Sequence, residues 1–314
     1  MNFLPSTKIT CRSSNIMPCR SRFQPVLLLM FFLLLGCAPA SSSPEPAPVL
    51  TATPALVPTD TQPATSNLTP DTSSPNTSWW RPAPGLTWQW QLGNDDIDTS
   101  IDADVFDVDL YVDQAIIDEL HAKGKKAICY ISVGSWEDWR PDAEQFPPEV
   151  LGKDYEGWPG EKWLDIRRID LLAPIMLARL DRCAAKGFDG VEPDNMQIWD
   201  NDTGFPLTYA DQLQYALWLA EQAHQRGLAI GQKNAPDMVA DLVDVYDFAI
   251  TEDAFYYGWA EAMQPYIAAH KPVFAAEYTD LPGDFAAFCR QSKALGFSTI
   301  LKKRDLDAWL ETCE

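Results

Sequence analysis

The sequence has little of what metal and nucleophile chemistry needs. Its three histidines, His121, His224 and His270, show no metal-ligand spacing, and no Cys-x-x-Cys pair is present. No glycine-rich phosphate loop follows the first strand pattern, and no histidine falls at a predicted strand end, where a serine or cysteine nucleophile would need its base. We therefore expect no metal, no cofactor and no Ser-His or Cys-His centre.

Positive charge is also scarce. The chain carries 24 basic and 45 acidic residues, a formal net charge of -21. Such a surface repels nucleic acid and anionic glycans and attracts a polycation, although many soluble proteins are acidic without a charged partner. We expect no nucleic-acid partner, and a cationic polymer fits the charge.

No apolar run is long enough to span a membrane. The longest, residues 26–36, has the length of a signal-peptide core, with Arg20 and Arg22 before it and Cys37 directly after it. Its end resembles a bacterial lipobox, which implies cleavage before Cys37 and lipidation of that sulfur. An ordinary secretory signal remains the alternative, and Met17 is a candidate for the true initiator. We expect export, with the mature protein lipid-anchored on a bacterial envelope or extracellular.

Composition divides the chain into three parts. Residues 1–36 form the leader, and residues 37–78 form a Ser/Thr/Pro-rich tether that cannot bury enough apolar surface to fold. Residues 79–314 have the length of one barrel-sized domain. We expect this domain to be a monomer held away from a surface.

Strand and helix patterns alternate along the folded part. Predicted strands cover 87–92, 105–111, 126–132, 190–195, 229–234, 248–253, 272–278 and 298–303. Predicted helices cover 113–123, 171–186, 208–226, 236–245, 259–270, 284–295 and 305–312. This alternation predicts a (β/α)8 TIM-type barrel. The gap between the first two strands is too short for a helix, so the first βα unit is atypical, and a doubly wound open sheet is the alternative.

Active sites in this fold lie at the carboxyl ends of the strands. The stretch 187–195, GFDGVEPDN, places Glu192 and Asp194 on one face of a strand that Pro193 brings to its end. Polar side chains end the other strands as well, and their convergence favours the paired carboxylates of glycoside hydrolysis.

At these positions the chain resembles a known family, glycoside hydrolase family 114, the endo-α-1,4-polygalactosaminidases. The resemblance runs from Trp88 to Cys313 and rests on the stretch 187–195, on GKKAICYISVGSWEDWR at 124–140 and on QKN, TED and LKKRDL at 232–234, 251–253 and 301–306. It implies cleavage inside α-1,4-linked, galactosamine-rich polymers, with Asp194 and Glu252 as the catalytic acids.

Position in the strands suggests how the two acids divide the work. Asp194 is expected to be the nucleophile or an ionised stabiliser, with Glu192 supporting it from beneath. Glu252, beside Phe255 and Tyr256, is expected to have a raised pKa and act as the acid, although the reverse assignment stays open. Carboxyl separations of roughly 5–5.5 Å give retention and roughly 6.5–9.5 Å give inversion, and we favour retention.

The remaining rim residues are expected to bind substrate, with Asp109 and Glu277 chosen for sugar ammonium groups. The other members of this set are Trp90, Tyr130, Glu192, Asn195, Lys233, Asn234, Asp253 and Tyr278. Two alternative functions remain open: a non-catalytic glycan-binding lipoprotein, and a hydrolase of another amino-sugar polymer.

Four cysteines remain after the leader and Cys37. We expect Cys289 to pair with Cys313, because the helix before the last strand and a final helix are neighbours in a barrel. Cys129 and Cys183 are left as either a pair or buried thiols.

Overall fold

The computed structural model describes residues 78–93 and 96–313, which lie in one compact unit, 74–314. The expected leader, the lipidation at Cys37 and residues 37–77 of the tether lie outside the described residues. Among the residues that are described, no helix combines the length and apolar character needed to cross a bilayer.

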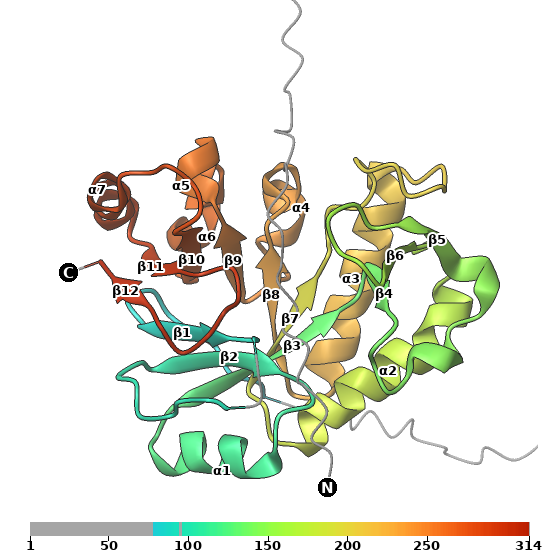
Figure 1. Ribbon diagram of the computed structural model, residues 1–314, viewed down its shortest axis with the longest axis horizontal. Helices are drawn as coiled ribbons and strands as arrows, with labels where there is room; N and C mark the ends of the chain where they lie inside the picture. The colour runs from blue at the N-terminus through green and yellow to red at the C-terminus, as the bar shows by residue number, and fades with distance from the viewer. Residues whose placement is uncertain (1–77, 94–95, 314) are drawn as a thin grey trace, which may run out of the picture. The chain divides into compact units, whose positions relative to one another are not determined.

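Eight parallel strands curl into a barrel (Figure 1). They are β1 (Trp88–Gln91), β2 (Val105–Asp109), β3 (Lys126–Ser132), β7 (Gly190–Asp194), β8 (Ala229–Lys233), β9 (Phe248–Glu252), β10 (Val273–Tyr278) and β11 (Ser298–Lys302). Each strand hydrogen-bonds to its successor in this order. The predicted (β/α)8 class and all eight strands are confirmed.

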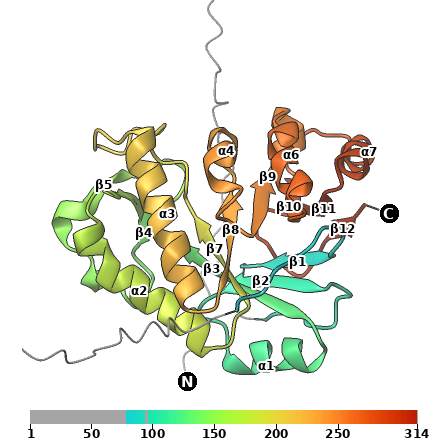
Figure 2. The same ribbon diagram turned by 180° about the vertical axis from the view of Figure 1, so that it is seen from behind.

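Helices cover the outside of the strands, as the two opposite views show (Figures 1 and 2). The longer ones are α1 (Gln114–Ala122), α2 (Ile169–Ala185), α3 (Tyr209–Gln225) and α7 (Phe285–Leu295). The others are short: η3 (Pro236–Met238), α4 (Val239–Leu242), α5 (Ala254–Tyr257), η4 (Ala260–Met263) and α6 (Gln264–Ala268). No helix lies between β1 and β2, which confirms the atypical first unit.

The ring closes between β11 and β1, at the seam between the first and last strands of the barrel. Trp88 Nε1 donates to the Ser298 carbonyl over 3.0 Å, and Lys302 Nζ donates to Gln89 Oε1 over 2.9 Å. The Leu92 amide reaches the Leu306 carbonyl at 3.2 Å. The strands follow one another in chain order and the first meets the last at this seam, which rules out the alternative of a doubly wound sheet, whose strand order reverses at its middle.

Large side chains fill the inside of the ring. Trp88, Phe248 and Phe274 are fully buried there, with Trp88 and Phe274 ring centroids 5.4 Å apart. Close packing of such side chains makes the centre of a barrel a core and not a pore. Polar groups are consequently confined to the ends of the strands and to a few buried pairs.

The predicted helix over 305–312 is wrong. The chain there forms turns and then β12 (Glu311–Thr312), which pairs antiparallel with β11. Side chains take the carbonyls that a helix would need: Lys302 Nζ binds the Asp307 carbonyl and Gln89 Nε2 binds the Ala308 carbonyl. These contacts and the left-handed backbone of Leu306 hold the segment against the seam.

An insertion between β3 and α2 was not predicted. It contains a three-stranded antiparallel sheet of β4 (Ser135–Glu137), β6 (Glu161–Leu164) and β5 (Leu151–Asp154), with the turns η1 (Ala143–Gln145) and η2 (Pro148–Val150). Figures 1 and 2 both show it beside α2 and α3.

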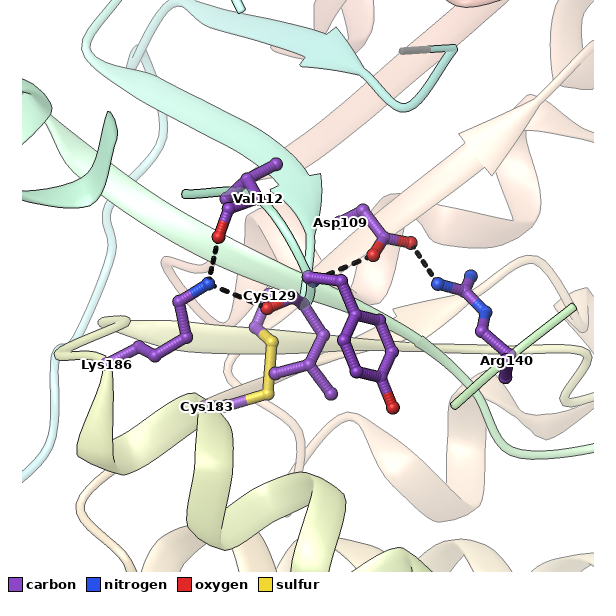
Figure 3. Close-up of a disulfide and its surroundings, with 8 residues drawn as sticks. Asp109, Val112, Cys129, Arg140, Cys183 and Lys186 are labelled. Atoms are coloured by element: carbon purple, nitrogen blue, oxygen red, sulfur yellow. Dashed lines mark hydrogen bonds and ion pairs between the residues drawn. A yellow bond between two sulfur atoms is a disulfide. The ribbon is translucent and has the colours of Figure 1, made fainter. Parts of the chain in front are cut away.

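Two disulfides tie helices to strands. Cys129 of β3 bonds to Cys183 of α2 (Figure 3), and Cys289 of α7 bonds to Cys313 after β12. The expected Cys289–Cys313 pairing is confirmed, although Cys313 directly follows the short strand β12 and does not lie in the final helix that we expected. The open question of Cys129 and Cys183 is settled as a pair.

The two bridges should stabilise the fold unequally. Their sequence separations are 54 and 24 residues, and the entropy removed from the unfolded chain grows with loop length. We expect the double Cys→Ala variant at 129 and 183 to lose about 4 kcal/mol of unfolding free energy, and that at 289 and 313 about 3 kcal/mol. Urea unfolding measures both losses. Under reducing conditions the wild type also lacks its disulfides, so the difference between wild type and variants should disappear. A difference that persists there would contradict the assignment.

Candidate active site

Three adjacent strands, β7, β8 and β9, bring acidic and basic side chains to one end of the barrel. β7 ends with Asp194, β8 with Lys233 and β9 with Glu252. The register pairs Lys233 with Ile250, and Glu252 follows Ile250 by two residues, so the Lys233 and Glu252 side chains point to the same face of the sheet. The predicted acids therefore share one site.

Lys233 is the centre of this site. Its Nζ lies 2.8 Å from Glu192 Oε1, 2.9 Å from Asp194 Oδ1 and 3.2 Å from Glu252 Oε2. The ammonium also lies 4.7 Å from the centre of the Trp90 ring. Lys233 is almost completely buried, so its charge is balanced by these carboxylates and not by water.

A tyrosine binds the other oxygen of each acid. Tyr130 donates its hydroxyl hydrogen to Asp194 Oδ2 over 2.9 Å, and Tyr278 donates to Glu252 Oε1 over 2.6 Å. Asn234 holds Glu252 from the backbone side, since its Oδ1 accepts from the Glu252 amide at 2.8 Å. Each carboxylate is thus fixed in orientation as well as in position.

Charge at the site is set by competition between burial and Lys233. Burial alone would raise the pKa of Asp194, but the ammonium and hydrogen bonds of Lys233 outweigh it, and the pKa is lowered. Burial would lower the pKa of Lys233, yet Asp194, Glu192 and Glu252 raise it well above its usual value. Asp194 is therefore a carboxylate and Lys233 an ammonium at neutral pH.

A second carboxyl pair lies beneath Asp194. Glu192 and Asp107 are fully buried, and as carboxylates both oxygens of Asp107 and Oε2 of Glu192 would lack a donor. Burial, and then Glu192, raise the pKa of Asp107 well above its usual value. The raised pKa favours a protonated Asp107, and in that state the carboxyl group can donate to Glu192. Sequence reasoning missed Asp107, although an acid within an otherwise apolar strand was a visible signal.

The backbone turns sharply after each of these strands. Asn195, Asn234 and Asp253 have φ values of 63°, 48° and 53°, in the left-handed region that Asn and Asp tolerate best. Asn195 Nδ2 donates to Ser132 Oγ and Ser135 Oγ, which fixes the turn after Asp194. Gly134 is needed beside it, because a Cβ there would lie 1.9 Å from the Asn195 carbonyl oxygen.

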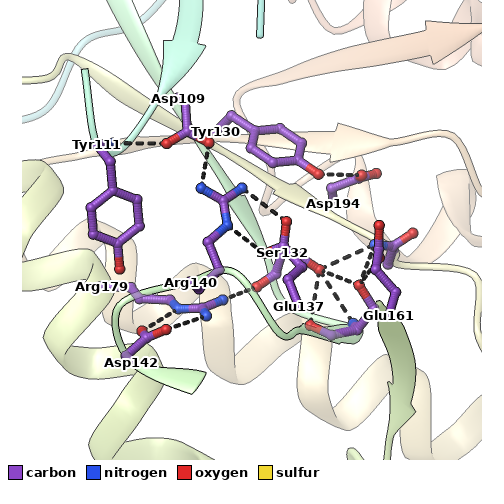
Figure 4. A network of polar contacts seen from close by, with 12 residues as sticks. Asp109, Tyr111, Tyr130, Ser132, Glu137, Arg140, Asp142, Glu161, Arg179 and Asp194 are labelled. Carbon is purple, nitrogen blue, oxygen red and sulfur yellow. Dashed lines mark hydrogen bonds and ion pairs between the residues drawn. The ribbon is translucent and has the colours of Figure 1, made fainter. Parts of the chain in front are cut away.

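Several other predicted binding residues are occupied within the protein. Asp109 pairs with Arg140 at 2.6 Å, as Figure 4 shows. Glu277 is buried and accepts the amides of Phe255 and Tyr256 at 2.9 and 3.1 Å. These bonds restrain the backbone beside the site, and they leave little of either carboxylate for a sugar ammonium group.

Asp253 and Trp90 also make internal contacts. Asp253 Oδ2 pairs with Arg304 at 2.5 Å, and burial raises the pKa of Asp253 to about 6. Trp90 is buried in the barrel interior below Lys233. Glu252 likewise meets Lys233 and the Tyr278 hydroxyl instead of the expected apolar surroundings.

Glu161, from the insertion, is a site residue that the sequence did not reveal. It is about 8% exposed and accepts from Ser135 Oγ at 2.6 Å (Figure 4). Burial, with Glu137 and Asp194 adding to it, raises the pKa of Glu161 to about 7. No sequence pattern identified it, because its place depends on how the insertion folds back onto β3.

The arrangement suits acid–base and nucleophilic work by carboxylates. No group of three or more His, Cys, Asp or Glu side chains with metal-binding geometry occurs in the described ranges, 78–93 and 96–313. Two carboxylates of different environment, facing one cation, can respectively attack a carbon and exchange a proton with an oxygen.

Comparison with known proteins points the same way. The sequence profile of glycoside-hydrolase family GH114 matches residues 69–314. The chain is similar to Aspergillus fumigatus Ega3, solved in complex with galactosamine, with 39% identity and a TM-score of 0.71 over 76% of this chain and 98% of that one.

Two more distant proteins are also similar. The glycoside hydrolase domain of PelA from Pseudomonas aeruginosa has 15% identity and a TM-score of 0.59, over 73% of this chain and 98% of that one, which shows the shared fold. An uncharacterized protein of Deinococcus radiodurans is 26% identical over 208 residues, 59% of this chain and 67% of that protein.

The site yields a prediction for stability. Lys233→Met removes the ammonium but keeps an unbranched side chain, so Glu192 and Asp194 stay buried without their cation. Breaking a buried pair in this way costs about 3–5 kcal/mol. We expect that loss of unfolding free energy at pH 7, measured by urea denaturation.

The loss should shrink as the pH falls. In the wild type the lowered pKa of Asp194 keeps its stabilising contribution at pH values above about 4, the unfolded value. Without Lys233 the buried carboxyls take up protons at higher pH, which stabilises the folded variant on acidification. Lys302→Met is the control, because Lys302 is buried against neutral oxygens of Gln89 and Asp307. A loss at pH 5 equal to that at pH 7 would contradict the assignment.

Proposed function

The chain belongs to glycoside hydrolase family GH114, and from this we propose that it is an endo-acting hydrolase of α-1,4-linked, galactosamine-rich polysaccharide with Asp194 and Glu252 as its catalytic acids. The chain is a glycoside hydrolase by family. What we propose beyond the family is the polymer, its linkage, cleavage inside the chain and the two catalytic residues.

One observation carries the assignment of the acids: both contact the same ammonium group. Since Lys233 Nζ lies 2.9 Å from Asp194 Oδ1 and 3.2 Å from Glu252 Oε2, these two oxygens are at most about 6 Å apart, so both acids can act on one glycosidic bond. Retention remains our preference, and it needs roughly 5–5.5 Å between the carboxyl groups.

In the proposed reaction Asp194 attacks the anomeric carbon while Glu252, which must be protonated for this step, gives its proton to the leaving glycosidic oxygen. The lowered pKa of Asp194 supports its choice as nucleophile, because it must be ionised before attack. Tyr130 orients Asp194 and Tyr278 orients Glu252 through their hydroxyl groups. Glu252, now a carboxylate, then takes a proton from a water molecule whose oxygen attacks the anomeric carbon, and the bond between that carbon and Asp194 breaks.

The substrate class follows from charge and from similarity. The chain has a formal net charge of -21, which attracts a polycation such as a de-N-acetylated galactosamine polymer. Ega3, to which this chain is 39% identical, was solved with galactosamine. Both observations favour an amino-sugar polymer over a neutral or anionic one.

We also propose that the protein is exported and lipid-anchored through Cys37, with residues 37–78 as tether and 79–314 as a monomeric catalytic domain. The two disulfides support an oxidising compartment. Mass spectrometry of the mature protein tests the anchor, which predicts an N-terminal, lipid-modified Cys37.

Cleavage should depend on both acids. We expect Asp194→Asn and Glu252→Gln to reduce release of reducing ends from deacetylated α-1,4-galactosamine polymer by at least about 10²–10⁴-fold, since each removes one catalytic carboxyl. Asp118→Asn, on the exposed face of α1, is the matched control and should retain wild-type activity. Internal cleavage predicts oligomers of mixed length among the early products. Carbohydrate binding by the wild type without new reducing ends would support a binding protein instead.

The stereochemistry of the product should follow the carboxyl separation. We expect the first product detected by proton NMR to have the α configuration at its new reducing end, before mutarotation mixes the anomers. A β product would assign an inverting mechanism and reject the covalent role of Asp194.

A further inference from the structure

A cavity of about 400 Å³ opens in the insertion between β3 and α2. It is lined by segments of β4, β5 and β6 and by the turn that joins β5 to β6. Its volume lies within the ~300–1,000 Å³ of typical small-molecule sites. None of the predicted substrate-binding residues lines it.

Aromatic side chains form one wall of this cavity. Trp158 is 56% exposed, and its ring centroid lies 6.4 Å from that of Tyr155. Trp136 is half-buried, with its indole nitrogen bound to the Ala143 carbonyl. Such an exposed ring face offers an apolar platform and attracts a cation. The free-standing Trp158 is therefore suited to bind a ring that carries positive charge.

Carboxylates face the same space. Asp138 is exposed and makes no ion pair with any residue in the described part of the chain. Glu161 is more than nine-tenths buried, and only its Oε2 has a donor, Ser135 Oγ, among the residues that the structure places. The Gly160 backbone lies close under Asp138, since a Cβ at Gly160 would meet Asp138 Oδ1 at 2.8 Å. Lys162 also lines the cavity, but its ammonium is paired with Asp154, so Asp138 and Glu161 are the acids left as acceptors for an ammonium group of a ligand.

The cavity is connected to the catalytic acids by hydrogen bonds. Glu161 Oε2 accepts from Ser135 Oγ, Ser135 Oγ accepts from Asn195 Nδ2 at 3.0 Å, and Asn195 follows Asp194 directly. Tyr155, which lines the cavity, is close enough to Asp194, Glu161 and Glu252 for their charges to add to burial in raising its pKa. The lining of the cavity and the catalytic acids are therefore neighbours in the fold.

We propose that this cavity is a distal subsite that binds one amino-sugar unit of the polysaccharide, with its ring against Trp158 and its ammonium group at Asp138 and Glu161. The inference rests on the proposed function, because it extends the same substrate along the same cleft. The insertion would then select sugars with free amino groups, because an N-acetyl group has no positive charge to pair with Asp138 and Glu161.

Binding to inactive full-length protein tests the subsite without hydrolysis. α-1,4-Galactosamine oligomers of two to six units are titrated into Glu252→Gln, and in parallel into Asp194→Asn, by calorimetry. Adding Trp158→Ala or Asp138→Asn should weaken hexamer binding about tenfold and change disaccharide binding by less than about twofold. Asp138→Asn should also reduce the ratio between the affinity for the hexamer with free amino groups and the affinity for the N-acetylated hexamer.

Trp309→Ala is the matched aromatic control, because Trp309 is exposed on the C-terminal segment, away from the insertion. Unchanged unfolding midpoints confirm that the variants fold. Hexamer binding by Trp158→Ala equal to that of Trp309→Ala overturns the subsite, as does failure of the hexamer to bind either inactive parent. The two proposals can also fail separately. If the wild type releases no reducing ends but Trp158→Ala still weakens hexamer binding, the hydrolase proposal is wrong and the subsite proposal stands.

Discussion

The contact of one buried ammonium with three carboxylates is the constraint on which the site depends. Lys233 reaches Glu192, Asp194 and Glu252 within 3.2 Å, although a lone ammonium at this depth would be strongly unfavourable. Each carboxylate in turn would be costly without the cation. The four groups therefore have to fold together, and the distance between the two proposed catalytic acids is set by the size of the group between them.

The fold supports this arrangement at two levels. Below the site, burial and Glu192 raise the pKa of Asp107, which favours the uncharged form of this fully buried acid. Above it, left-handed turns at Asn195, Asn234 and Asp253 end the strands directly after the functional side chains. Such turns carry strain that the surrounding hydrogen bonds must hold, which is a frequent property of functional sites. Position and protonation are thus both built into the barrel.

The sequence predicted the barrel strands because they are short, apolar and rich in β-branched residues, and these local properties survive in the structure. The helix predicted over 305–312 is wrong, because contacts of this segment with Gln89, Lys302 and β11 replace the hydrogen bonds that a helix would form. Glu161 and Asp107 were missed for the same reason, since their importance comes from neighbours and not from spacing. The rim acids were predicted as a set, but only the structure showed that Asp109 pairs with Arg140 and that Glu277 accepts a backbone amide.

The seam between β1 and β11 bears on how the chain reaches its native state. Its contacts, Trp88 to Ser298 and Gln89 to Ala308, join residues 210 and 219 positions apart. Loop-closure entropy makes contacts of such high sequence separation late and slow to form. Closure of the ring therefore requires residues from both ends of the domain, and until the C-terminal residues have been made the free edge of β1 is open to aggregation.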